Sequence, residues 1–447
     1  MSEPERKVDV ASLGTPAIPS PLRAWGAPGH GVGRFVPDGT WVRSRVECGP
    51  GAEAPDGCHG DLLFEKAGPR ARIFFEPART RAAVVTCGGL SPGLNNVIRS
   101  LFLELYHNYG VPEVLGIREG YRGLNPGVGK PPVRLTPEMV DDIHKEGGTM
   151  LASSRGEQDV GTMVDCLVHQ KIDILFCVGG DGTQRGANAI GREVARRGLR
   201  IAVVGIPKTI DNDVAYCTRT FGYVTAVEEA SRVLQLAHVE AKGAPRGIGL
   251  VKLMGRDAGY IVCGAVLGSQ EVNFALIPEV PFALEGEGGL LDVLALRMDA
   301  RDHAVIAVAE GAGQQLCGDA AGLGCDASGN PRRHDIGVLL KERITAHFDA
   351  IGKPVALKYF DPSYIIRSCV SDTDDSILCD HLARRAAHAA MAGKTDVVVS
   401  YLNESFVHVP IPMVVEAKRR VDPEGELWAS VLATTGQPAR MGAVAAS

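Results

Sequence analysis

The chain has 447 residues, of which 45% are apolar, and its formal net charge is −6. This length suits two lobes of roughly 150–200 residues, each able to bury a core. The acidic balance argues against a nucleic-acid-binding surface, which needs a basic excess. No apolar run approaches the ~20 residues of a membrane-spanning helix. The charged N-terminus lacks the apolar core of a signal peptide, so we expect a cytoplasmic protein without a membrane or nucleic-acid partner.

Residues 1–56 are rich in Pro and Gly and show little periodicity, so we expect partial disorder or an arm that wraps a neighbouring subunit. The stretch 60–77 contains short apolar runs and is expected to start the folded body. The 11 cysteines are scattered without a CxxC pair, which predicts reduced, buried thiols and no zinc site.

From Arg81 onward, short apolar runs alternate with amphipathic helices. Uninterrupted runs of this kind are typical of strands covered on both faces, and their alternation with helices predicts βα units with mostly parallel sheets. The predicted strands are 82–87, 172–178, 201–205, 248–253, 304–309, 354–358 and 397–400. Because ligands of α/β folds bind at the carboxyl ends of strands, the loops after these strands are the candidate functional segments.

Two glycine-rich loops suit phosphate binding. The loop 88–94, with Gly88 at its start, lets backbone N–H groups approach phosphate oxygens beside a helix N-terminus; a tight turn without ligand is equally compatible. The loop 179–183 surrounds Asp181 with glycines. A single carboxylate of this kind can hold Mg²⁺ together with phosphates and water. The alternative is that Asp181 caps the next helix, although a cap does not need the glycines.

The loop 207–213 combines a lysine, a hydroxyl and two carboxylates. Asp211 is a candidate base for an attacking hydroxyl, Asp213 can support it, and Lys208 can offset phosphate charge. A self-bonded turn of Asp and Asn residues is the structural alternative.

Other strand ends add cations and one acid. Arg256 follows the strand 248–253 and can bind a phosphate with two hydrogen bonds, or pair with Asp257 at the surface. Glu310 follows the strand 304–309 and can hold a sugar hydroxyl or cap a turn.

Four further residues can donate hydrogen bonds to a phosphate. Three of them lie near the end of the alternating strand and helix pattern, and one lies earlier in the chain. Lys358, Tyr364 and Arg367 can bind a phosphate, or they are ordinary surface residues. Arg155 lies among small residues, from which it can reach transferring phosphate oxygens, or it occupies a simple turn.

Nine motifs occur in order: TCGGLSPGLNN, GIREGYRGL, GGTMLASSRG, VGGDGT, PKTIDND, FGYVTA, VKLMGRDAGY, AEGA and YFDPSYIIR. Together they resemble the 6-phosphofructokinase family over about residues 70 to 410. The N-terminal extension and the wording FEKAGPRARIFFEP resemble its long-chain, ATP-dependent branch of plants, trypanosomes and some bacteria. The resemblance implies a glycolytic kinase that moves the γ-phosphate of Mg-ATP to the 1-hydroxyl of fructose 6-phosphate, giving fructose 1,6-bisphosphate and ADP.

The resemblance also implies an architecture of two similar Rossmann-like α/β lobes with the active site in the cleft between them. An extension, 1–80, precedes a larger ATP-binding lobe. The implied bounds are 81–222 and 366–418 for the larger lobe, and 223–365 and 419–447 for the smaller, sugar-phosphate-binding lobe with the C-terminal tail. A homo-oligomer, tetramer or dimer, with allosteric control is expected, since the family is usually tetrameric and soluble oligomers are mostly closed and symmetric.

Residue roles are likewise implied by motif match. Asp211 takes the proton from the sugar hydroxyl, with Thr209 and Arg256 completing the catalytic set, and Asp181 holds Mg²⁺. The residues that border the nucleotide phosphates are Gly88, Arg155, Gly180, Asp181, Gly182 and Thr183. The residues that contact the sugar phosphate or the transferring group are Thr209, Asp211, Asp213, Met254, Gly255, Arg256, Glu310, Tyr364 and Arg367, with Lys358 as a weaker candidate.

The phosphate donor depends on two positions. Diphosphate-dependent members carry Asp where this chain has Gly182, and that carboxylate would repel the α-phosphate of ATP. They also carry Lys at the position of Lys208, whereas short bacterial ATP-dependent members have Gly. Gly182 favours ATP, and a diphosphate-dependent phosphotransferase is the alternative. A lipid or NAD kinase would share only GGDGT, and a non-catalytic subunit would be expected to lose Asp181, Asp211 or Arg256.

Overall fold

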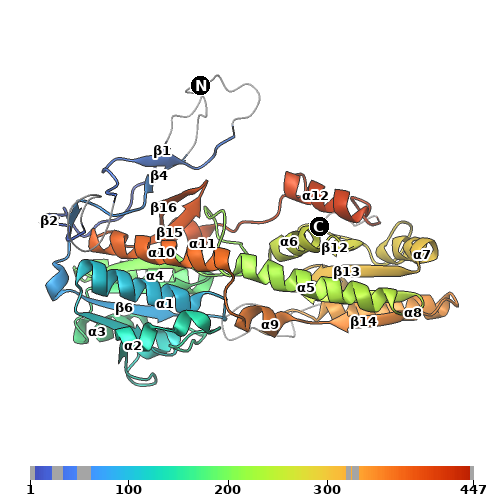
Figure 1. Ribbon diagram of the computed structural model, residues 1–447, viewed down its shortest axis with the longest axis horizontal. Helices are drawn as coiled ribbons and strands as arrows, with labels where there is room; N and C mark the ends of the chain where they lie inside the picture. The colour runs from blue at the N-terminus through green and yellow to red at the C-terminus, as the bar shows by residue number, and fades with distance from the viewer. Residues whose placement is uncertain (1–5, 23–33, 48–61, 319–323, 325–331, 443–447) are drawn as a thin grey trace. The chain divides into compact units, whose positions relative to one another are not determined.

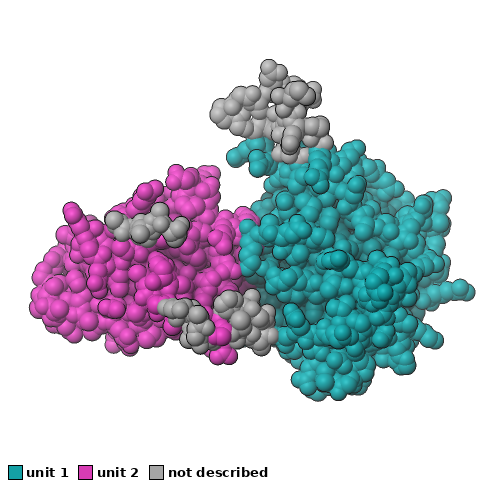
Figure 2. Space-filling model, turned by 180° about the vertical axis from the view of Figure 1, so that it is seen from behind, with its two compact units in different colours: residues 1–209, 214–222, 368–418 teal, residues 210–213, 223–367, 419–447 magenta. Residues whose placement is uncertain are grey.

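The computed structural model describes residues 6–22, 34–47, 62–318, 324 and 332–442. The chain forms two compact units (Figure 2). Unit 1 comprises 1–209, 214–222 and 368–418, and unit 2 comprises 210–213, 223–367 and 419–447. The extension is therefore part of unit 1, and the four residues Ile210–Asp213, expected in the larger lobe, group with unit 2.

Unit 1 is built on a sheet that has 10 strands among the described residues, in the order β1-β4-β16-β15-β10-β9-β6-β7-β8, with β3 paired to β4 (Figure 1). The strands are β1 (Arg6–Lys7), β3 (Trp41–Arg43), β4 (Leu62–Lys66), β6 (Arg81–Thr86), β7 (Glu113–Ile117), β8 (Val133–Arg134), β9 (Ile174–Gly179), β10 (Ala202–Pro207), β15 (Val397–Leu402) and β16 (Ser405–Pro410). The central strands from β15 to β7 are parallel, and the predicted strands of this unit are confirmed.

Helices cover both faces of this sheet, because successive strand residues point to opposite sides. Ala82 and Val84 of β6 pack with α1 and α10, whereas Ala83 and Val85 pack with α3 and α4. The helices are α1 (Leu94–Leu103), α2 (Pro137–Val140), α3 (Val160–His169), α4 (Asp181–Arg196), α10 (Thr373–Met391) and α11 (Ile411–Glu416), with short 3₁₀ turns at Pro77–Arg79, Gly120–Leu124 and Ile143–Lys145. α1 is followed directly by a π-helical segment, Glu104–Tyr109.

The extension packs on its own chain. β1 and β3 pair with β4, and β2 (Ile18–Pro19) pairs with β5 (Arg72–Ile73). Val8 and Leu22 are buried. The expectation of disorder is thus not met by 6–22 and 34–47, which pack on their own chain, whereas contact with a neighbouring subunit stays a prediction; the rest of 1–56 lies outside the described residues.

Unit 2 has a four-stranded parallel sheet in the order β12-β13-β11-β14 within the part of the chain that is described. Its strands are β11 (Gly247–Leu253), β12 (Phe274–Leu276), β13 (His303–Ala309) and β14 (Ala356–Phe360). Its helices are α5 (Tyr223–Lys242), α6 (Tyr260–Ser269), α7 (Leu290–Arg301), α8 (Ile336–Ala350), α9 (Ser363–Ser368) and α12 (Glu426–Thr435), with a 3₁₀ turn at Gln314–Cys317. Two α/β units with mostly parallel sheets confirm the predicted fold class. None of the helices described has the length and apolar character that crossing a membrane requires.

Candidate active site

The phosphate-binding loops expected in unit 1 follow three neighbouring strands, β6, β9 and β10. The backbone N–H of Lys208, after β10, donates to the carbonyl of Gly179 at the end of β9 (3.1 Å). The Lys208 side chain reaches past β9 and donates from Nζ to the carbonyl of Gly89, after β6 (2.5 Å). The three loops are therefore joined at one edge of the sheet, where parallel strands place their ligand sites.

The segment that contains Arg155 lies beside the first of these loops. Gly88 has φ +86°, a conformation that suits glycine. Its N–H donates to the carbonyl of Ser154 (3.1 Å), and its carbonyl accepts from the Ser153 hydroxyl (2.7 Å). Arg155 follows directly and is exposed, so the structure brings it next to Gly88 as the motif order implies.

Asp181 lies at the first position of α4, with Gly180 as the extended N-cap residue. The predicted loop 179–183 is therefore too long, since Asp181, Gly182 and Thr183 are helical. A carboxylate in the first turn is stabilised by the helix dipole, which gives Asp181 a structural role whether or not a ligand is bound. Its Oδ2 also lies 3.1 Å from Nζ of Lys418.

Gly182 borders open space. A Cβ built on it would meet nothing within 4 Å, whereas a Cβ on Gly179 would lie 2.1 Å from Oγ1 of Thr183. The space beside the Asp181 carboxylate suits Mg²⁺ that arrives with phosphates, since Mg²⁺ binds through one or two carboxylates. Among the described residues, no three or more His, Cys, Asp or Glu side chains are grouped to hold a metal by themselves.

In unit 2, the ends of β11 and β13 are held together by backbone hydrogen bonds. The N–H of Glu310 donates to the carbonyl of Leu253 (2.9 Å), and that of Gly311 to the carbonyl of Gly255 (3.1 Å). A Cβ on Gly311 would lie 1.9 Å from the carbonyl oxygen of Arg256, so only glycine allows this close approach. The structure thereby places Glu310 beside the segment Met254–Arg256.

Arg367 joins this group from α9, with Nε 3.0 Å from Sδ of Met254. Asp211 lies within the same electrostatic cluster. Burial, together with the charges of Asp213 and Glu310, raises the pKa of its carboxyl to about 8, although Arg367 and a backbone hydrogen bond from Arg256 oppose the rise. A carboxyl that holds its proton this strongly is typical of a group that exchanges protons near neutral pH.

Two predicted residues are not drawn into this cluster. Lys358 is exposed in the middle of β14, two residues before the end of that strand, and it lies opposite Gly249, four residues before the end of β11. Tyr364 on α9 has an exposed fraction of 83%. Among the described residues of unit 2, no side-chain hydrogen bond or ion pair joins either of them to Met254 or Glu310.

Sequence reasoning missed several charged contacts of unit 2, including the partner of Asp257, a residue that the sequence suggests only as an alternative partner of Arg256. Asp257 pairs with Arg333 (2.5 Å), which also lies near Gly311. The Lys252 side chain contacts Asp335 and Asp361. The one visible signal was Lys252 itself, a charge inside the apolar run IGLVKLM.

Comparison with known proteins identifies the family. A model described as Phosphofructokinase matches residues 81–390, well over half of the chain. The chain belongs to the phosphofructokinase family. A phosphofructokinase named ATP-dependent 6-phosphofructokinase, from Borreliella burgdorferi, is 48% identical over 85% of this chain and 86% of its own length. A protein of the same name from Amycolatopsis methanolica is 48% identical over 89% and 86%. Arabidopsis thaliana ATP-dependent 6-phosphofructokinase 7 is 45% identical over 87% and 79%.

Solved phosphofructokinases share the fold at much lower identity. The crystal structure of a pyrophosphate-dependent phosphofructokinase from Marinobacter aquaeolei has a TM-score of 0.66 and 17% identity, covering 82% of this chain and 92% of that one. A pyrophosphate-dependent phosphofructokinase from Nitrosospira multiformis gives 0.65 and 14%, covering 77% and 86%. At these identities the likeness concerns the fold and not the donor.

Proposed function

We propose that this chain is an ATP-dependent 6-phosphofructokinase, which converts fructose 6-phosphate and ATP to fructose 1,6-bisphosphate and ADP in glycolysis. The observation that carries the proposal is the 48% identity, over 85% of the chain, to a relative named for this activity. The presence of Asp181, Asp211 and Arg256 favours a catalytic chain over a regulatory subunit.

Asp211 is the proposed general base. It accepts the proton of the sugar 1-hydroxyl as that oxygen forms its bond to the γ-phosphorus and the bond from phosphorus to the leaving oxygen of ADP breaks. Its raised pKa is compatible with proton exchange near neutral pH. Thr209 precedes it by two residues and Asp213 follows by two, so both are proposed to border the transferring group.

The sugar phosphate is proposed to bind at the joined ends of β11 and β13. Arg256 and Arg367 supply charge for its phosphate, and Glu310 accepts hydrogen bonds from sugar hydroxyls, while Met254 and Gly255 line the site. Tyr364 can reach the same ligand only from an exposed position. Lys358 is left out because of its place in mid-strand.

The nucleotide phosphates are proposed to lie along the carboxyl ends of β6, β9 and β10. Gly88 borders them, its own N–H being bonded to the Ser154 carbonyl, and the backbone N–H of Gly180 and the side chains of Thr183 and Arg155 bind them. Asp181 holds Mg²⁺, which neutralises charge on the transferring phosphates when it is bound.

ATP is the proposed donor because Gly182 leaves open space beside the phosphate edge. Lys208 is the feature that favours diphosphate, but its Nζ is bonded to the Gly89 carbonyl and so supports the loop itself. The relatives named above are ATP-dependent by name, which supports the same choice.

The test is product formation from fructose 6-phosphate and Mg²⁺ with either ATP or diphosphate. Fructose 1,6-bisphosphate with ATP alone is expected. Product with diphosphate at comparable efficiency would overturn the donor assignment, and product with neither, in an enzyme that binds both ligands, would support a non-catalytic chain.

We also propose a cytoplasmic homo-oligomer, either dimer or tetramer, under allosteric control. One Arabidopsis thaliana relative, 42% identical, is named chloroplastic, so location differs among relatives. Size-exclusion chromatography with light scattering measures the assembly directly.

A further inference from the structure

Lys252 is a charged residue in the middle of an apolar parallel sheet. It is the sixth of the seven residues of β11, whose other residues are all buried, and its side chain has an exposed fraction of only 12%. Withdrawing an ammonium group from water is unfavourable unless partners compensate it. Partners of opposite charge are therefore expected around this lysine.

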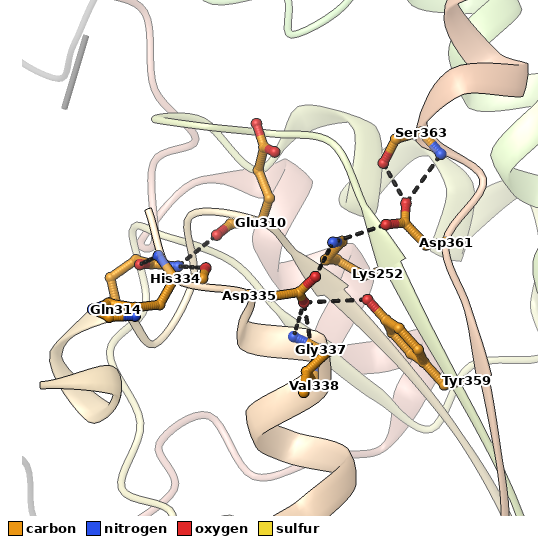
Figure 3. Close-up of polar contacts among 10 residues, drawn as sticks. All are labelled: Lys252, Glu310, Gln314, His334, Asp335, Gly337, Val338, Tyr359, Asp361 and Ser363. Carbon is orange, nitrogen blue, oxygen red and sulfur yellow. Dashed lines mark hydrogen bonds and ion pairs between the residues drawn. The ribbon is translucent and has the colours of Figure 1, made fainter. Parts of the chain in front are cut away.

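Two carboxylates compensate it (Figure 3). Lys252 Nζ lies 2.6 Å from Oδ2 of Asp335 and 2.8 Å from Oδ2 of Asp361. These hydrogen bonds outweigh burial and raise the pKa of Lys252, and they help hold the pKa of both carboxyls below the ordinary range. The group is therefore fully charged at physiological pH.

Each carboxylate also fixes the start of a helix. Asp335 is the N-cap of α8, and its Oδ1 accepts from the N–H groups of Gly337 (3.0 Å) and Val338 (3.1 Å) and from the Tyr359 hydroxyl (3.2 Å). Asp361 follows β14, and its Oδ1 accepts from the N–H of Ser363 (3.2 Å) and from its hydroxyl. Ser363 begins α9, the helix that carries Arg367.

A short relay continues from the α8 cap to Glu310. Gln314 Nε2 donates to the carbonyls of Glu310 (2.8 Å) and His334 (3.2 Å), and its Oε1 accepts from the N–H of His334 (3.2 Å). His334 precedes Asp335 directly. In Figure 3 the Glu310 carboxylate points away from this relay, which leaves it available for a ligand while its backbone is fixed.

We propose that Lys252 is a positioning residue for the sugar-phosphate site: it binds the starts of α8 and α9 to the end of β11 and so sets the relative placement of Arg256, Glu310 and Arg367. The inference rests on the proposed function. Lys252 does not touch substrate; it acts through Asp335 and Asp361, whose side chains are 40% and 37% exposed. Without the shared cation, the like charges of these two carboxylates would repel each other and loosen both helix starts.

The principal experiment replaces Lys252 by Met, which keeps the aliphatic stem and removes the charge. The KM for fructose 6-phosphate is expected to rise about 10-fold or more, because small misplacements of binding groups are costly, while the KM for ATP stays within about 2-fold. Lys252→Arg, which can contact both carboxylates, is expected to recover most of the affinity.

A matched control is available in the same unit. Lys353→Met removes a lysine that is paired with Asp299 (2.7 Å) just before the other end of β14. It is expected to leave both KM values unchanged. If Lys252→Met behaves like this control, or raises both KM values equally, the positioning role is overturned.

Two further measurements keep the result interpretable. Asp361→Asn weakens the ion pair with Lys252 without removing the lysine, so it should raise the KM for fructose 6-phosphate by a smaller factor. When it is combined with Lys252→Met, the KM should rise little further, because both changes break the same interaction. Calorimetric titration with fructose 6-phosphate alone tests binding independently of turnover. Wild-type protein that neither binds nor phosphorylates this sugar would refute the proposed function itself, whereas a normal wild type with an unselective Lys252→Met variant would refute only the positioning role.

Discussion

At the scale of single residues, Asp211 is the group on which the proposed chemistry depends most. Asp211→Asn keeps the size and the hydrogen-bonding shape of the side chain but cannot accept the hydroxyl proton. We expect kcat to fall by at least ~10²-fold, with the affinity for fructose 6-phosphate largely kept. Steady-state kinetics and calorimetric titration measure the two effects. Asp349→Asn, on the exposed end of α8, is the control, and near-normal turnover of Asp211→Asn would exclude Asp211 as the base.

The raised pKa of Asp211 has a definite sign in the pH dependence. A base works only when it is unprotonated, so kcat/KM for fructose 6-phosphate should rise with pH as the carboxyl loses its proton, with the limb near the pKa of about 8. The second ionisation of the substrate phosphate, near pH 6 for phosphate monoesters, occurs in every variant. The Asp211→Asn profile should therefore keep the substrate's limb and lose the higher one.

Gly182 provides a test of the donor that does not endanger folding. Because a Cβ there would meet no neighbouring segment within 4 Å, and an acid in the first turn of α4 is favoured by the dipole, Gly182→Asp should fold normally. We expect kcat/KM for ATP to fall about 10-fold or more through charge repulsion. Gly182→Asn adds a side chain of similar size without the charge, so its kcat/KM for ATP should fall less than that of Gly182→Asp. An unchanged kcat/KM for ATP in Gly182→Asp would contradict the proposal that Gly182 determines the use of ATP as donor.

The role of a residue could be predicted from the sequence only where the residues that act together lie close to one another in one motif. Asp211 and Asp213 lie two positions apart, so their shared electrostatics follow from the sequence. Lys252 and Asp335 are 83 positions apart, and only the parallel pairing of β11 with β14 and the packing of α8 bring them together. The lysine was visible as an anomaly, but its partners were not.

At the scale of elements, a buried ion network joins the extension to the central sheet. Glu65 of β4 lies opposite His408 of β16 and contacts Arg70 Nη2 (2.9 Å), Lys394 Nζ (2.8 Å) and His408 Nδ1 (3.3 Å). Burial would raise the pKa of Glu65, but the hydrogen bonds and charges of His408 and Lys394 hold it well below its ordinary range. Because an ionised carboxylate only accepts hydrogen bonds, His408 donates through Nδ1.

Glu65→Gln should therefore destabilise the protein. Removing one member of a buried ion network leaves the others uncompensated, and we expect a loss of about 3 kcal/mol in the free energy of unfolding. Asp142→Asn, in a pair with Lys145 whose side chains are 70% and 65% exposed, should lose less than about 1 kcal/mol. Since the folded pKa of Glu65 is depressed, its contribution is present above the unfolded value and is lost as pH falls below it. Denaturant unfolding at pH 7 and pH 4 should thus show a smaller difference between wild type and variant at pH 4.

Elements were predictable in proportion to their buried length. β6 and β9 are each covered on both faces and read as unbroken apolar runs, so they were placed within one or two residues. β1 and β2 have two residues each, too few for any periodicity, and their pairing depends on partners more than 50 positions away. The start of α4 was missed because glycines on both sides of Asp181 disfavour a helix locally, whereas packing of the later turns determines it.

At the scale of the whole molecule, the extension is expected to stabilise unit 1. Deleting residues 1–56 removes β1 and β3, leaves β4 paired with β16 alone, and uncovers core positions filled by Val8 and Leu22. We expect the midpoint of thermal unfolding to fall by about 5 °C or more. Leu22→Ala, in the full-length chain, should also destabilise the protein and lower its free energy of unfolding by about 2 kcal/mol or more.

Oligomer mass distinguishes two origins of this effect. If the extension acts within its own chain, the deletion lowers the unfolding midpoint and leaves the mass measured by light scattering unchanged. A smaller mass would indicate that the extension also supports the assembly. An unchanged midpoint would contradict the packing of β1 and β3 on β4 as a source of stability.

The order of strands along the chain also bears on how the protein is synthesised. The four strands described in unit 2 lie in the uninterrupted stretch 223–367, whereas β15, which pairs with β10 in unit 1, begins only at Val397. As the chain leaves the ribosome, the sheet of unit 2 can therefore close while β10 still has an unpaired, apolar edge. That edge is open to wrong partners until β15 emerges. The nascent chain can thus complete the sheet of unit 2 before the sheet of unit 1, although the last segment of unit 2, 419–447, follows both. A chaperone that shields β10 would act in the interval between the closing of the two sheets.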